Sequence, residues 1–237
     1  MIEKRQFYID GAWADPLAGR DHHVIDPSTE DPCAVISLGG QADTDAAVAA
    51  ARAALPGWMA TPVAERIAHV EKILEVYKSR AEDMAQAISV EMGAPIDMAR
   101  QQQVGAGVWH ITNFLKAARE FEFEAPLGDH APNDRIIHEA VGVVGMITPW
   151  NWPMNQVTLK VIAGLVAGCT MVLKPSEESP LNAVVFAEII HEACMGLAKE
   201  LGADGIRVNA VAPGLIDTDI HASAGLADRL AAKAGDV

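Results

Sequence analysis

Cysteine and positive charge are scarce in this sequence, and each shortage excludes a class of protein. The 237 residues include three cysteines, Cys33, Cys169 and Cys194, whose odd number and wide spacing fit a reducing compartment better than a disulfide scaffold. Eighteen Lys and Arg stand against 32 Asp and Glu, for a formal net charge of −14. Such a chain is expected to bind neither nucleic acid nor an anionic membrane.

Long uninterrupted apolar segments and clustered metal ligands are also missing. Residues 1–5 carry no apolar stretch of the kind found in a secretory signal. The charge-free run from Val141 to Leu159 is interrupted by prolines and amide side chains, which are costly in hydrocarbon. His22 and His23 have no further ligand at a metal-binding spacing. We therefore expect a cytoplasmic protein without a metal site.

The first 140 residues predict a β-hairpin followed by a largely helical segment. Asp10-Gly11 lies between Phe7-Tyr8-Ile9 and Ala12-Trp13, a pattern typical of a two-residue hairpin turn. Apolar residues at alternating steps of three and four over residues 65–92 indicate one helix or two abutting helices. Further helices are expected over residues 44–55, capped by Asp43 and ended by Pro56-Gly57, and over residues 95–120.

The spacing of apolar residues changes after residue 140, where continuous apolar runs alternate with helical patterns. Residues 141–148 and 170–173 are branched, continuous runs that predict strands buried on both faces, and residues 206–211 predict a third strand. Helices are expected between them, one from Pro153 to Gly168 and one opened by Ser179-Pro180. The fold class is therefore α/β, with a helical N-terminal segment and a hairpin followed by a partial Rossmann-like parallel βαβαβ sheet.

Ligands bind beyond the carboxyl ends of the strands in an open parallel sheet. That rule selects three segments, which are expected to line one crevice: Thr148–Pro153, Lys174–Glu178 and Ala212–Thr218.

The first two of these segments carry a family resemblance. With the hairpin and the helical segment before them, Thr148-Pro149-Trp150-Asn151 and Lys174-Pro175-Ser176-Glu177 resemble the aldehyde dehydrogenase superfamily over about residues 7–193. The resemblance implies that the Asn151 amide donates to the oxyanion formed when a cysteine attacks the aldehyde. The alternative, which the neighbouring Pro and Trp residues disfavour, is that Asn151 merely caps the helix at Pro153.

The same resemblance implies NAD as the cofactor. Lys174 and Glu177 occupy the positions that hold the adenosine ribose, and a carboxylate there accepts from both ribose hydroxyls but repels a 2′-phosphate, so NADP is less favoured. Without the resemblance, residues 174–178 are a solvated loop. The residues implied to contact the cofactor in this part of the chain are Ile147, Thr148, Pro149, Trp150, Lys174, Ser176 and Glu177.

The sequence also departs from the family pattern. Family members use a cysteine in a Gly-Gln-x-Cys setting as the nucleophile and a glutamate as the base, and both lie downstream of where the resemblance ends. None of the three cysteines here has that setting. The glycine-rich turn that meets the pyrophosphate is absent as well.

A second resemblance begins where the first ends. Residues 195–225, including Gly205-Ile206-Arg207-Val208-Asn209 and Pro213-Gly214, resemble the later part of a short-chain dehydrogenase/reductase. This resemblance implies nicotinamide contacts by Pro213, Gly214, Ile216 and Thr218. That family also needs a Tyr-x-x-x-Lys pair, but the chain has two tyrosines, Tyr8 and Tyr77, and neither is followed by a lysine four residues on.

The chain is thus interpreted as two dehydrogenase segments joined near Ala193–Met195. Three parts are expected: the hairpin and helical segment (1–140), the first part of an NAD-binding domain (141–193) and a reductase-like fragment (194–237). The leading hypothesis is an NAD-dependent oxidoreductase that takes a small aldehyde to a carboxylic acid, in a chain that lacks its nucleophile and base. The alternatives are a reductase of alcohols or ketones, and an inactive remnant or interaction module that forms a homo-oligomer.

Overall fold

The computed structural model describes residues 1–201 and 208–210 of the chain. The expected nicotinamide contacts of the reductase-like fragment, Pro213, Gly214, Ile216 and Thr218, lie outside these described residues.

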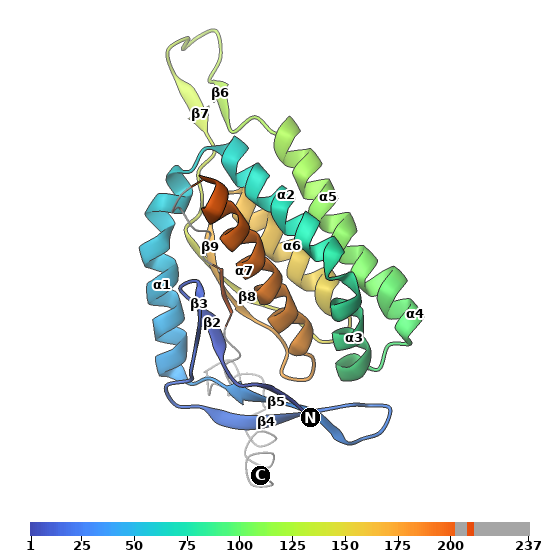
Figure 1. Cartoon of the computed structure of the whole chain (residues 1–237). Helices are drawn as coiled ribbons and strands as arrows, with labels where there is room; N and C mark the ends of the chain where they lie inside the picture. The colour runs from blue at the N-terminus through green and yellow to red at the C-terminus, as the bar shows by residue number, and fades with distance from the viewer. Residues whose placement is uncertain (202–207, 211–237) are drawn as a thin grey trace, which may run out of the picture.

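Five short strands form the N-terminal part (Figure 1). The hairpin predicted around Asp10-Gly11 is confirmed, since strands β2 (Phe7–Ile9) and β3 (Ala12–Ala14) pair antiparallel, and Asp10 and Gly11 have φ angles of 55° and 77°. Two positive φ angles in succession are characteristic of the type I′ turn that suits a twisted hairpin. Strands β1 (Ile2–Lys4), β4 (Arg20–Ile25) and β5 (Pro32–Leu38) form a separate sheet in the order β1-β5-β4.

The next part of the chain is a helical layer. Helix α1 spans Gln41–Ala60, α2 spans Val63–Ser79, α3 spans Ala81–Met92, α4 spans Ile96–Met98, and a π-helical stretch, Ala99–Gln103, leads into α5 (Val104–Glu120). The pattern over residues 65–92 therefore corresponds to two abutting helices. The helix expected over residues 95–120 is present, with a π-helical stretch inside it.

Two details expected of the first helix are wrong. Asp43 is not its cap but lies in its first turn, where its carboxylate accepts the N–H groups of Gly40 (2.9 Å) and Leu17 (2.7 Å). Pro56 does not end the helix, which continues to Ala60. The last turn is held from outside, because the Trp58 side chain is buried and its Nε1–H donates to the Leu165 carbonyl at 3.2 Å.

The remaining elements alternate strand and helix after a protruding hairpin. Strands β6 (Glu124–Pro126) and β7 (Arg135–Ile137) form that hairpin, which extends from the helical layer in Figure 1. Then come β8 (Val143–Ile147), α6 (Pro153–Val166), β9 (Thr170–Lys174), α7 (Leu181–Leu201) and β10 (Val208–Ala210). The sheet order is β3-β2-β10-β9-β8, with β9 parallel to both β8 and β10. The mixed α/β class is thus confirmed.

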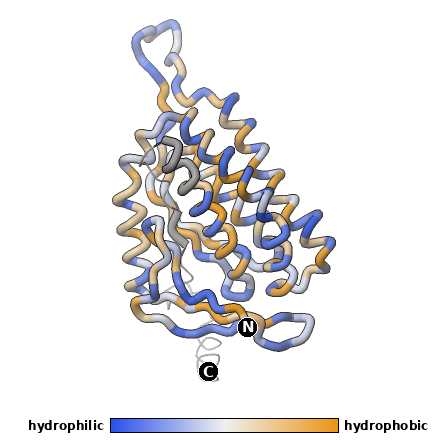
Figure 2. The backbone as a smooth tube through the Cα atoms, viewed as in Figure 1, coloured by the Kyte–Doolittle hydropathy of each residue, from blue (hydrophilic) through white to orange (hydrophobic). Residues whose placement is uncertain are grey.

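The main apolar core lies where α2, α5, α6 and α7 pack together and against β8 and β9. Figure 2 shows hydrophobic residues concentrated on the central helices and hydrophilic ones on the outer hairpin. Helix α5 turns one face to this core, because Val104, Ile111, Leu115 and Ala118 are buried and Val108 packs against it. Among the described residues, no helix combines the length and the apolar character needed to cross a membrane.

Helix α6 ends at the glycine that the sequence predicts, and distant side chains cap it. Gly168 has a φ of 85°, a conformation that favours glycine. A Cβ at this position would also lie 3.1 Å from a guanidinium nitrogen of Arg66. The Arg66 side chain is buried and its Nε–H donates to the Val166 carbonyl at 3.0 Å, so a cation stands at the negative end of the helix.

Strand β8 is not buried on both faces as expected. Its middle residue Gly145 and its last residue Ile147 are exposed, the latter to 76%. Within the described part of the chain β8 is an edge strand paired with β9 alone, and α1 packs more extensively on β9 than on β8. The uniform apolar run therefore indicates a strand correctly, but it does not show which face other elements cover.

Helices α2 and α5 approach closely at one glycine. The Tyr77 hydroxyl donates to the Val104 carbonyl at 3.2 Å, and a Cβ on Gly107 would lie 2.2 Å from the same hydroxyl oxygen. Gly105, one residue along from Val104 in α5, has no heavy atom within 4 Å of a built Cβ. A side chain at position 107 would therefore collide with Tyr77, whereas one at position 105 would have open space around it.

We predict that Gly107→Ala lowers the free energy of unfolding by about 1–3 kcal/mol, because the new methyl group displaces the buried tyrosine. Gly105→Ala is the matched control, and it should raise the free energy of unfolding by about 0.5–1 kcal/mol, since alanine is the better helix former. Urea unfolding followed by circular dichroism measures both. Equal effects of the two substitutions would contradict the close approach.

Candidate functional site

Two of the three predicted segments meet at one end of the sheet. Strands β8 and β9 are parallel with Ile147 opposite Lys174, and the Thr148 N–H donates to the Lys174 carbonyl at 3.1 Å. This bond extends the pairing by one residue beyond β8. The Thr148–Pro153 and Lys174–Glu178 segments therefore leave the sheet side by side.

An ion pair occupies the loop after β9. The Lys174 Nζ lies 2.5 Å from the Glu177 Oε2, and both side chains are partly buried. Partial burial acts to raise the pKa of Glu177, but the hydrogen bond and charge of Lys174 outweigh it and hold the pKa below its ordinary value. At neutral pH this carboxylate is therefore charged.

The loop itself is a tight turn. Ser176 Oγ accepts the Glu178 N–H at 3.3 Å, and the Ser176 carbonyl accepts the Ser179 N–H at 3.2 Å. Glu177 thus lies at the centre of a short, internally bonded loop, where it is partly buried and Glu178 is exposed.

The loop after β8 presents Trp150 and Asn151 to solvent. Trp150 is 53% exposed, and the exposed Asn151 amide makes no hydrogen bond to any other described residue. The alternative in which Asn151 caps the following helix is wrong, because the N-cap of α6 is Trp152 and no side chain caps it. The Asn151 amide is therefore not committed to the fold.

The cap predicted for α7 is also wrong, and the residue that replaces it was missed. Ser179 does not accept a backbone N–H of α7; instead Glu91, the penultimate residue of α3, accepts the N–H groups of Leu181 (2.5 Å) and Asn182 (2.9 Å). Glu91 is buried, which raises its pKa to about 7 against the opposing effect of its hydrogen bonds. One signal was available: Glu91 falls three residues after Ile88, at the next position of the apolar stripe.

None of the three thiols lies in the loops that follow β8 and β9, although Cys33 packs in an apolar cluster with Leu181 at the start of α7. Cys169 precedes β9 at the end opposite Lys174, roughly 17 Å away given the rise of a strand. Cys33 is in β5, and burial, its largest influence, raises the pKa of its thiol. Cys194 lies in α7 and packs against the main core.

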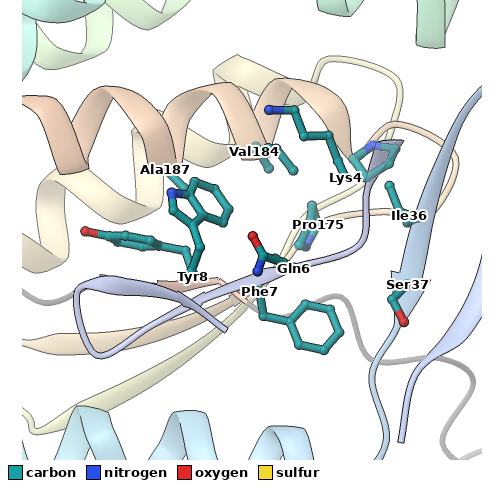
Figure 3. Close-up of a pocket in the computed structure, with 12 residues that line it drawn as sticks. Lys4, Gln6, Phe7, Tyr8, Ile36, Ser37, Pro175, Val184 and Ala187 are labelled. Carbon is teal, nitrogen blue, oxygen red and sulfur yellow. The ribbon is translucent and has the colours of Figure 1, made fainter. Parts of the chain in front are cut away.

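A small pocket of about 30 Å³ lies between the β2–β3 hairpin, β5 and the start of α7 (Figure 3). It contains none of the predicted site residues, although it reaches Pro175, the neighbour of Lys174 in the loop. It therefore borders the loop after β9 without including the ion pair. Among the described residues, no three His, Cys, Asp or Glu side chains gather as a metal site would require.

Comparison with known proteins matches two families along the chain. Residues 13–201 match the aldehyde dehydrogenase family, and residues 189–236 match a family described as enoyl-(acyl carrier protein) reductase. The two matches overlap in α7, where the sequence predicts the join.

Individual relatives agree with the first match. The chain is 41% identical to a 3-succinoylsemialdehyde-pyridine dehydrogenase of a Pseudomonas species over 89% of its own length and 44% of the relative's. Its fold is similar to that of an aldehyde dehydrogenase from Bartonella henselae, with a TM-score of 0.84 and 51% identity over 94% of this chain and 45% of that one.

A second solved structure is a variant of aldehyde dehydrogenase C from Pseudomonas syringae in complex with NAD⁺ and octanal. It has a TM-score of 0.80 and 40% identity, and the alignment covers 89% of this chain and 41% of that one. The chain therefore spans less than half the length of the relatives it matches.

We predict that Lys174→Met raises the pKa of Glu177 toward its ordinary value, because the substitution removes the cation that stabilises the carboxylate. Titration of the side-chain carboxyl carbon by NMR measures the change. Lys160→Met, which removes an ammonium that donates to Gln156 instead, is the control and should leave the Glu177 titration unchanged. An unaltered titration in Lys174→Met would contradict the ion pair.

Proposed function

The chain belongs to the aldehyde dehydrogenase family, and from that premise we propose that residues 141–193 hold the adenosine end of NAD in an oxidoreductase that takes aldehydes to carboxylic acids. The observation that carries the proposal is the Lys174–Glu177 pair at the carboxyl end of β9, next to the end of β8. Ligands of parallel α/β sheets bind at this position. NAD, when bound, accepts the hydride that the aldehyde loses.

The chemistry of the residues present fits a ribose. Glu177 is an ionised carboxylate, which can only accept hydrogen bonds, and the two hydroxyls of a ribose are the donors that such a group requires. Lys174 supplies donors on the same loop. A 2′-phosphate placed beside Glu177 would be repelled, and so we propose NAD rather than NADP.

Thr148, Pro149 and Trp150 are proposed to contact the cofactor from the neighbouring loop, together with Ile147 at the end of β8. Support comes from their position, since this loop leaves the sheet beside the Lys174 loop, and the apolar side chains of Ile147 and Trp150 are exposed, whereas Thr148 is buried. Exposed apolar side chains next to a charged loop suit a ligand that has both a flat ring and hydroxyl groups.

Asn151 is proposed to donate its amide to the oxygen of the aldehyde as negative charge develops there. Its support is the uncommitted amide, since the start of α6 does not use it. A neutral amide donor keeps the same form over a wide pH range, which suits this role.

The nucleophile and the base are not assigned to any residue of this chain. Thioester formation requires a thiolate near the Asn151 amide, and the three cysteines of the sequence lie in β5, before β9 and in α7. We therefore propose that the 237-residue chain alone binds the cofactor and does not oxidise aldehydes. The alternative of a short-chain reductase is less favoured, because no tyrosine of the sequence has the required lysine.

We predict saturable binding of NAD to the chain, measured by isothermal titration calorimetry, with at least a tenfold weaker affinity in Glu177→Gln. The substitution removes the charged acceptor for a ribose hydroxyl, and a hydrogen bond to a charged group contributes roughly 1.5–3 kcal/mol. Glu178→Gln changes the adjacent exposed carboxylate and is the matched control, with an unchanged affinity. Absence of heat at millimolar NAD would rule out the proposed NAD site. Equal affinities for NAD and NADP would contradict the proposed preference for NAD.

We also predict that the chain forms no NADH from a short aliphatic aldehyde, followed by the absorbance of NADH. A variant with Ser at positions 33, 169 and 194 should give the same baseline. Turnover that disappears in this variant would show that one of the three thiols acts as a nucleophile after all.

A further inference from the structure

We propose that Glu91 is a positioning residue for the cofactor loop: by capping α7 from a different helix, it fixes the turn that presents Ser176 and Glu177. This inference rests on the proposed NAD site, because the loop in question is the one that carries the Lys174–Glu177 pair. Glu91 itself is proposed to touch no cofactor, since it is 3% exposed.

The first turn of α7 creates the need for a cap. The Pro180 carbonyl accepts the N–H groups of Ala183 and Val184, both at 3.1 Å, and so the helical bonding begins there. The N–H groups of Leu181 and Asn182 have no acceptor within the helix, as at every helix N-terminus. A buried N–H without an acceptor costs roughly 1–3 kcal/mol.

Glu91 meets this need with both of its oxygens. Its Oε2 accepts the Leu181 N–H at 2.5 Å, and its Oε1 accepts both the Asn182 N–H at 2.9 Å and the Asn182 Nδ2 at 2.6 Å. The positive end of the helix dipole also favours a carboxylate at this point. One side chain from α3 therefore replaces the local cap that Ser179 does not provide.

The same network continues into the loop. Asn182 Nδ2 also donates to the carbonyl of Ser179 at 2.8 Å and to its hydroxyl at 3.0 Å. Ser179, Asn182 and Glu91 are all buried. The last residues of the loop are thus bound to Glu91 through Asn182 as well as through the backbone of α7.

The loop is short enough for this anchor to control it. Lys174 is fixed in the sheet opposite Ile147, and Leu181 is fixed by Glu91, so six residues separate the two anchors. Glu177 lies in the middle of them and has two attachments, the turn at Ser176 and the ion pair with Lys174. Release of the α7 end therefore frees the carboxylate that the ribose would meet.

The first test needs no cofactor. In Glu91→Gln one accepting oxygen becomes an N–H₂ group, which faces a backbone N–H or the Asn182 amide. Hydrogen exchange followed by mass spectrometry should show at least tenfold faster exchange over residues 176–182 and unchanged exchange over α5. Tyr77→Phe, which removes one buried hydrogen bond elsewhere in the core, is the matched control and should leave the loop protected.

The second test measures NAD affinity by calorimetry at a temperature where all variants are folded. Glu91→Gln should weaken binding at least tenfold, whereas Tyr77→Phe should keep the affinity of the parent chain. If Glu91→Gln does not fold, Asn182→Ala takes its place, because it removes the side-chain link to Ser179 and keeps the backbone bonds to Glu91. Its expected effect is in the same direction and smaller.

The outcomes separate this inference from the proposed function. Faster hydrogen exchange over residues 176–182 in Glu91→Gln would support the role of Glu91 in the loop. If the parent chain at the same time binds no NAD, the cofactor proposal is overturned. NAD affinity within twofold of the parent in Glu91→Gln, or faster exchange spread evenly over the whole chain, would overturn the inference and leave the cofactor proposal standing.

Discussion

The pairing of β9 with parallel strands on both of its edges is the constraint on which the rest of the arrangement depends. Because β8 runs in the same direction as β9, both strands deliver their following loops to one end of the sheet. The helices that connect them must then return along the sheet, and α6 and α7 accordingly pack in the main core. A parallel ladder thus determines both where the core lies and where polar side chains can gather.

The sequence was informative wherever the determinant is local. Asp10-Gly11 predicts the hairpin, the branched runs predict β8 and β9, and Gly168 predicts the end of α6, because in each case the neighbouring residues decide the conformation. It failed where the partner is distant. The indole of Trp58 holds the helix that Pro56 was expected to end, and the α7 cap comes from a different helix, so no local pattern contains either answer.

The join between the two family matches is compatible with the fold for a simple reason. Phe186, Ile190 and Ala193 are buried on one side of α7, and the helix continues through the overlap of the two matches to Leu201. The fold then requires a strand that can pair with β9, and the short stretch Val208–Ala210 does so in parallel. Such a strand needs suitable backbone pairing, and these three residues pair in register with Met171, Val172 and Leu173.

Cofactor binding and bond-making chemistry depend on different physical requirements, and the proposed function assigns only the first of them to this chain. The proposed ribose site needs only an ionised acceptor and a donor on one loop, and Glu177 and Lys174 are such a pair between β9 and α7. A thiolate nucleophile needs a lowered pKa and a position within reach of the Asn151 amide. Burial raises the pKa of Cys33 instead, and Cys169 precedes β9 at the end opposite Lys174. The same parallel sheet that gathers the proposed cofactor contacts therefore keeps that buried cysteine away from them.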